Sequence, residues 1–215
     1  MARQVRSEVT RRRLLDAAVQ VIGEVGYPAA GRVAIVERAG VTKGALYHHF
    51  DSMEALASTI IDEGATTLLG AFRGMCGSSA PALEGLIHGM FAAADAMALD
   101  PKARVAAHLV FACCDFNESA VRLRGTWLTE ISAQVDRAIA EADLRDDVHP
   151  QAISEVVAAA FFGAGALSGS AAADGGPVGR LTRMWALVLP AIVAEASQGY
   201  FREFLAREVV RRQRG

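Results

Sequence analysis

The sequence is poor in cysteine and in lysine. Its 215 residues contain three cysteines, Cys76, Cys113 and Cys114, and two lysines against twenty arginines. An odd number of cysteines without regular spacing argues against a disulfide framework and is typical of a reducing compartment. The N-terminus is charged from Arg3 to Arg13 and has no apolar run behind a cationic start, so we expect no signal peptide and a cytoplasmic protein.

Long uncharged runs are also scarce. One stretch, residues 156–173, has no charged residue over eighteen positions, a length that could cross a membrane. It consists mostly of alanine and glycine and has no basic flank, so we expect a buried helix and no membrane partner. Small residues on a buried helix let another helix approach closely, which favours a homodimer interface here.

Motifs for catalysis are absent. The chain has no glycine-rich phosphate loop, no nucleophile elbow and no carboxylate pair in a defined setting. His108, Cys113, Cys114 and Asp115 lie close together but lack the CxxC or HxxxH spacing of a metal site, and adjacent helical residues point about 100° apart. We therefore expect buried thiols, no metal, no cofactor and no enzymatic activity.

The charge is unevenly distributed along the chain. Residues 1–50 hold eight Lys or Arg and four Asp or Glu, whereas the remainder holds fourteen and twenty. A basic N-terminal part on an acidic body favours a phosphate-facing module, although chance clustering would give the same count. We expect residues 1–7 to form a mobile basic arm. Arg11 to Arg13 near the expected start of the first helix oppose its dipole, so they either contact phosphate or are ordinary solvated arginines.

Apolar residues recur at helical spacing, and no segment alternates with the period of a strand. We predict an all-α fold of nine or ten helices without internal repeats. Pro190 should kink the helix that contains it. The expected helices span about 8–24, 32–39, 42–50, 52–73, 82–97, 102–114, 117–142, 151–168, 178–196 and 198–214.

Residues 41–50, Val-Thr-Lys-Gly-Ala-Leu-Tyr-His-His-Phe, carry the most informative pattern. One helix is expected to end at Ala39, Gly40 suits a tight turn, and Thr42 is a good N-cap for the next helix. Two short helices about a glycine turn indicate a helix-turn-helix, whose second helix enters the DNA major groove.

This motif resembles the DNA-binding domain of TetR-family repressors. The resemblance rests on Gly26-Tyr27, Ile35 to Gly40, Val41 to Phe50 and Glu54-Ala55-Leu56. It implies a three-helix DNA-binding domain over residues 1–50 and a helical ligand-binding and dimerisation domain over 51–215. The expected DNA-binding residues are Arg3, Arg6, Arg11, Thr42, Lys43, Gly44, Tyr47 and His48.

The chain departs from the family pattern at three positions. Gly31 and Arg32 stand where the family usually has a capping Thr or Ser and an apolar residue, so we expect a weak helix start and an Arg32 that faces the DNA backbone. Met53 replaces a phosphate-contacting lysine, which should make the salt dependence of DNA binding shallower by about one charge.

The body resembles the γ-butyrolactone receptor subgroup. The matching features include the N-terminal Met-Ala-Arg-Gln, Leu83-Glu84, Asp100-Pro101 with Arg104, Trp127 and Gly163. In that subgroup the matching tryptophan lines the ligand pocket, which implies this role for Trp127. A ligand-facing glutamine of the subgroup is replaced by Gly64, so either the pocket is wider or its polar group comes from elsewhere, with His88, Thr126 and Thr129 as candidates. Phe162 is a further candidate ligand residue.

The resemblance implies a homodimeric, ligand-responsive repressor. It would bind a double-stranded, pseudo-palindromic DNA operator and be released by a small γ-butyrolactone, butenolide or furan-like inducer, with genes of secondary metabolism or antibiotics as targets. Two alternatives stay open: a drug-sensing repressor of an efflux or resistance gene, and a small-molecule-modifying enzyme, which measurable turnover of a ligand would reveal.

Overall fold

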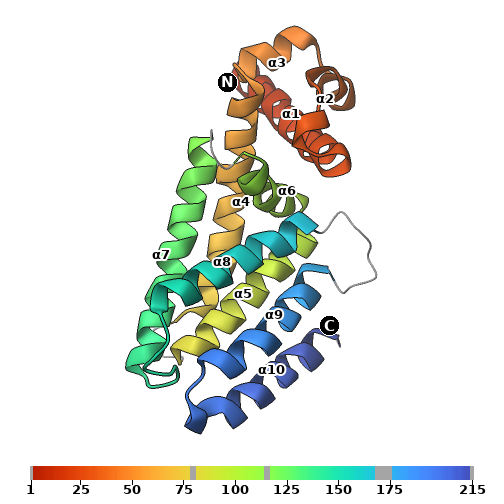
Figure 1. Ribbon diagram of the computed structural model, residues 1–215. Coiled ribbons are helices and arrows are strands. Elements are labelled where there is room, and N and C mark those ends of the chain that lie inside the picture. The colour runs from red at the N-terminus through yellow and green to blue at the C-terminus, as the bar shows by residue number, and fades with distance from the viewer. Residues whose placement is uncertain (1, 78–80, 114–116, 168–175, 214–215) are drawn as a thin grey trace. The chain divides into compact units, whose positions relative to one another are not determined.

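The computed structural model describes residues 2–77, 81–113, 117–167 and 176–213 (Figure 1). These residues form ten α-helices and no strand, which confirms the all-α prediction, and one isolated antiparallel bridge joins Leu144 to Val193. The predicted residues Cys114 and Asp115 lie outside the described residues. The helices are α1 (Ala2–Val25), α2 (Arg32–Ala39), α3 (Lys43–His49), α4 (Met53–Met75), α5 (Ala82–Leu99), α6 (Pro101–Ala112), α7 (Glu118–Ala140), α8 (Pro150–Ala166), α9 (Gly176–Ile192) and α10 (Gln198–Gln213).

The chain divides into two compact units. The first contains Met1–Thr67 and Leu99–Arg124, and the second contains Leu68–Ala98 and Gly125–Gly215. Helices α4 and α7 each contribute residues to both units. These units are defined by packing. The predicted boundary at residue 50 separates a DNA-binding part from a ligand-binding part of the chain, and it stays a prediction.

The expected mobile arm is wrong, because α1 begins at Ala2 rather than near Glu8. No glycine or proline interrupts residues 2–22, so nothing breaks the helix there, and the Thr10 hydroxyl donates to the Arg6 carbonyl at 2.9 Å. Arg11 to Arg13 are consequently well inside the helix, and the argument from an unfavourable first-turn dipole does not apply to them.

The first three helices pack as the helix-turn-helix pattern predicts. Leu14, Leu15 and Ile22 of α1 are buried together with Ile35 of α2 and Leu46 of α3. Gly40 takes the left-handed conformation after α2, and the Thr42 hydroxyl caps α3 by accepting from the Ala45 backbone N–H at 3.2 Å. Both expectations for this turn are confirmed, and Gly31 gives α2 no side-chain cap, as expected.

Helix α6 crosses α4 unusually closely within the first unit. A Cβ added at Gly64 of α4 would lie 2.4 Å from the Cβ of Ala106 and 3.0 Å from the Lys102 carbonyl oxygen. The space that a side chain would need is therefore filled by α6. This result corrects the expectation that Gly64 widens a ligand pocket, since the glycine serves close helix packing instead.

The second unit is built around α5. One face of α5 is fully buried and consists of Leu83, Leu86, Ile87, Met90 and Phe91. Gly89 lets this helix approach α4, since a Cβ there would lie 2.8 Å from the Phe72 ring. Among the described helices, α5 alone is long and apolar enough to cross a membrane, and 61% of it is buried inside the protein.

Helix α10 packs against α5 through a charged cluster. Glu208 is buried, its carboxylate lies 2.9 Å from His88 Nε2, and it also pairs with Arg212. Burial alone would raise the pKa of Glu208, but the hydrogen bonds from Arg212 and His88 outweigh burial and hold this pKa below its usual value. Tyr200 of this helix is exposed, and its hydroxyl donates to Glu84 at 2.5 Å.

We predict that Gly64→Ala destabilises the protein by about 1–3 kcal/mol, because the added methyl group must displace the α6 backbone. Gly70→Ala, on the same helix with open space around the added Cβ, should instead stabilise it by about 0.5–1 kcal/mol through helix propensity. Urea denaturation of both variants measures the difference. Equal stability of the two variants would contradict the close crossing at Gly64.

Candidate functional site

A cationic and aromatic cluster lies on the exposed side of the helix-turn-helix. Arg32, at the start of α2, places its guanidinium 5.5 Å from the centroid of the Tyr47 ring, with Nη1 3.4 Å from the Tyr47 hydroxyl. Lys43 of α3 lies on the same ring, with Nζ 5.9 Å from its centroid. All three side chains are exposed. The cluster therefore offers two cations and a hydroxyl on one surface.

The other predicted residues of α3 are also exposed. Thr42, Gly44 and His48 are solvent accessible, and the Thr42 hydroxyl is already engaged in capping the helix. The His48 and His49 rings meet edge to face at 5.2 Å. Burial, with His48 and Arg11 nearby, lowers the pKa of His49, which keeps this imidazole neutral near pH 7.

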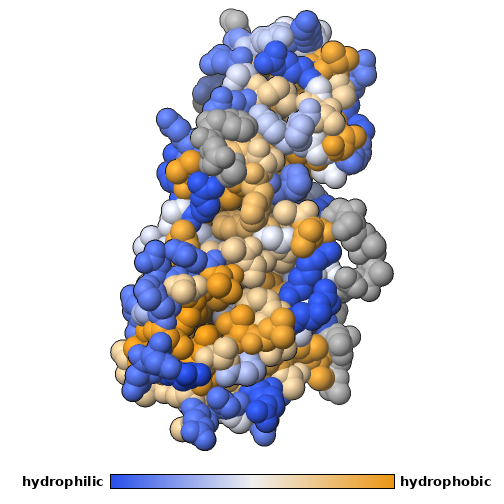
Figure 2. Space-filling model, viewed as in Figure 1, coloured by the Kyte–Doolittle hydropathy of each residue, from blue (hydrophilic) through white to orange (hydrophobic). Residues whose placement is uncertain are grey.

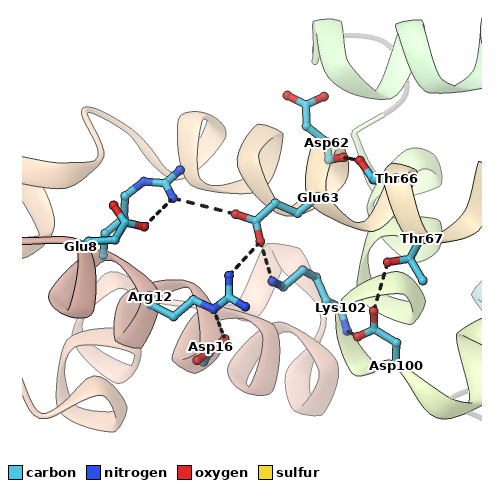
Figure 3. A network of polar contacts seen from close by, with 10 residues as sticks. Glu8, Arg12, Asp16, Asp62, Glu63, Thr66, Thr67, Asp100 and Lys102 are labelled. Atoms are coloured by element: carbon cyan, nitrogen blue, oxygen red, sulfur yellow. Dashed lines mark hydrogen bonds and ion pairs between the residues drawn. The ribbon is translucent and has the colours of Figure 1, made fainter. Parts of the chain in front are cut away.

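Glu63 of α4 is the centre of a different group of contacts (Figure 3). Arg11 belongs to this group. Its guanidinium lies 3.8 Å from one Glu63 oxygen and 5.5 Å from the centroid of the Phe50 ring. The other Glu63 oxygen is 3.8 Å from Arg12 and 2.5 Å from Lys102 Nζ of α6. One carboxylate thus joins α1, α4 and α6. Arg6 is exposed on α1, and the predicted DNA contacts of Arg3, Arg6 and Arg11 stay predictions.

The second unit contains an aromatic cluster around Trp127 of α7. The indole is fully buried and stacks on the ring of Phe161 of α8, with 4.4 Å between the ring centroids. The centroid of the Phe72 ring of α4 lies 5.2 Å from that of the indole. Phe162 is also predicted as a ligand residue, and the centroid of its ring lies 5.9 Å from that of Trp127. The structure therefore brings together two of the candidate ligand residues. Phe72 and Phe161 were not identified from the sequence, although the Phe161-Phe162 pair inside an uncharged run was an available signal.

The Trp127 indole N–H is buried without a hydrogen-bond acceptor among the described residues. An unmade hydrogen bond of this kind costs about 1–3 kcal/mol, so buried donors are usually satisfied. A bound molecule with a carbonyl oxygen would satisfy it.

The remaining ligand candidates are placed differently. His88 faces α10 and pairs with Glu208, while Thr126 is half-buried next to Trp127 in α7. The Thr129 hydroxyl donates to the Gly125 carbonyl at 3.0 Å. Among the residues that the structure describes, no group of three His, Cys, Asp or Glu side chains could hold a metal ion. Burial raises the pKa of the Cys76 thiol to about 11, so this cysteine is protonated and unreactive at neutral pH.

The chain is similar to known regulatory proteins. Residues 14–60 match the family described as bacterial regulatory proteins, tetR family. Over 192 residues the sequence is 29% identical to the A-factor receptor protein of Streptomyces griseus, a match that covers 89% of this chain and 67% of that protein.

Solved structures share the fold. A crystal structure of a γ-butyrolactone receptor, described as ArpA-like, superposes with a TM-score of 0.76 at 23% identity and covers 94% of this chain and 97% of the other. CprB from Streptomyces coelicolor, solved in complex with its biological operator sequence, gives a TM-score of 0.76 at 24% identity with the same coverage. At these identities the similarity shows the fold alone.

Proposed function

We propose that the chain is a homodimeric transcriptional repressor of the TetR type and that a small lactone-like molecule releases it from its operator. The match of residues 14–60 to the tetR family supports this proposal. The observation that carries this proposal is the exposed Arg32, Lys43 and Tyr47 cluster on the helix-turn-helix. Arginine and lysine bind phosphate oxygens or guanine edges, and a tyrosine hydroxyl donates to phosphate. Arg32 therefore adds a cation at the family position where an apolar residue is usual.

The aromatic cluster at Trp127 supports a lactone-like inducer. Phe161 supplies a flat wall parallel to the indole, and the indole N–H supplies one donor for a carbonyl oxygen. A molecule that inserts here must separate the Trp127 and Phe161 rings. It releases DNA only if it binds the released state of the protein better than the operator-bound state.

The outer faces of α8 and α9 support the homodimer. Residues Ala152, Val156 and Ala159 of α8 are exposed, as is Leu187 of α9, whose side chain is 79% exposed. Figure 2 shows hydrophobic residues gathered on the face of the second unit that carries α8. Alanine side chains let a helix of a second copy approach closely. A two-fold dimer would present two recognition helices to half-sites about one DNA turn apart.

For DNA binding, we predict that Tyr47→Ala and Lys43→Ala each weaken operator affinity by about 10–100-fold, through the loss of one contact worth about 1–3 kcal/mol. Tyr200→Ala is the matched control, because Tyr200 is exposed to a similar degree, 47% against 43% for Tyr47, but lies on α10. Fluorescence anisotropy of a labelled fragment from the protein's own upstream region gives the affinities. Normal binding by either α3 variant would remove that residue from the interface.

For the inducer, we predict that Trp127→Phe retains operator affinity but raises the lactone concentration needed for release by about 10-fold, the effect of one lost hydrogen bond. Phenylalanine keeps the stacked ring and removes the N–H, whereas alanine would open a cavity in the core. The same anisotropy assay, with a panel of γ-butyrolactones, butenolides and furans added to the complex, measures release. An unchanged response would make Trp127 an ordinary core residue.

For the dimer, we predict that Leu187→Glu raises the dissociation constant of the dimer by at least about 100-fold, because it places an unpaired charge in the apolar interface. Leu99→Glu is the control, since Leu99 is also highly exposed but lies outside α8 and α9. Sedimentation velocity distinguishes monomer from dimer. If both variants remain dimeric, the interface lies on another face.

A further inference from the structure

We propose that a cavity between α9 and α10 is a second small-molecule site, and that its ligand is a short apolar carboxylate. The cavity has a volume of about 300 Å³, at the lower end of the range for ligand pockets. None of the residues that line it belongs to the aromatic cluster at Trp127.

The floor of the cavity is apolar and buried. It is formed by Trp185 and Leu189 of α9 and by Phe201 and Leu205 of α10, all of which are buried. Such a floor gains free energy by removing a hydrocarbon chain or ring from water. The floor therefore selects for an apolar body of limited size.

The rim supplies a positive charge. Arg202 and Gln198 of α10 line the opening, and Arg202 has no ion-pair partner among the described residues. Arg207, one and a half turns further along the same helix, is paired with Glu203 at 3.7 Å and lies over the Tyr200 ring. A guanidinium beside an amide is suited to a carboxylate, which accepts from both.

Trp185 adds a second, independent indication of a ligand. It is fully buried, and its indole N–H has no acceptor among the described residues. Trp185 lines the cavity, but its indole nitrogen has no accessible surface, so a bound molecule must first displace the ring before one of its oxygen atoms accepts from this donor. An apolar carboxylate provides both an apolar body and acceptor oxygens, whereas a hydrocarbon would leave the donor and the guanidinium unsatisfied.

The test follows the indole signals of ¹⁵N-labelled wild-type protein during titration with octanoate. The chain contains two tryptophans, so two indole N–H signals are expected. Either Trp127→Phe or Trp185→Phe assigns both signals, because each variant removes one of them. We expect a saturable downfield shift of the Trp185 signal, as its N–H gains an acceptor, without a comparable change at Trp127. Octan-1-ol, which lacks the carboxylate, should bind at least 10-fold more weakly.

Two arginine variants test the charge. Arg202→Gln should raise the half-saturating octanoate concentration at least 10-fold, whereas Arg207→Gln on the same helix should leave it unchanged. Equal binding of octanoate and octan-1-ol would overturn the carboxylate assignment, as would equal effects of the two variants.

The absence of any Trp185 shift at millimolar octanoate would overturn the site itself. If Pro190→Lys at the rim then converts a dimer into a monomer in sedimentation velocity, a second copy of the chain covers the cavity. These outcomes do not depend on operator binding or on release by a lactone, so this proposal and the proposed function can fail separately.

Discussion

The packing of the first unit depends on the crossing of α6 over α4, where two adjacent residues have opposite roles. Gly64 removes the side chain that would separate the helices, and Glu63 supplies the charge that holds three cations beside it. Lys102 is largely buried, so its pairing with Glu63 offsets a desolvation cost that an exposed lysine would not have. Arg11 and Arg12 link α1 to Glu63, and α1 in turn packs against α2 and α3.

The two tryptophans share one physical feature in different surroundings. Each indole is fully buried, and each N–H lacks an acceptor among the described residues. Trp127 is enclosed by aromatic rings, which suits a flat neutral ring, whereas Trp185 borders a cavity with an arginine at its rim, which suits a negatively charged group. The two proposed sites therefore differ in the charge of the ligand that suits them.

Two departures from the family pattern have physical explanations in the structure. Arg32 replaces an apolar residue, and its guanidinium lies over Tyr47, so the cation joins the exposed cluster of the helix-turn-helix. Gly64 replaces a glutamine, and α6 occupies the space. Met53 leaves α4 without the usual lysine, but Ser52 still caps this helix by accepting from the Ala55 N–H at 3.0 Å. A missing residue of the pattern therefore did not mean a missing structural element.

The sequence by itself determined most of the helices and the capped turn of the helix-turn-helix, because these depend on contacts between residues a few positions apart. Apolar residues at helical spacing, with Gly40 and Thr42 at the turn, were sufficient for that, whereas the start of α1 was placed too late. It also indicated Trp127 and Phe162, but not Phe72 or Phe161 as their neighbours. Only the tertiary structure decided that Glu63 joins three helices, that Gly64 is a packing residue and that Trp185 borders a cavity. These features arise between segments that are distant in the chain, where helical periodicity shows which face is apolar but not which helix covers it.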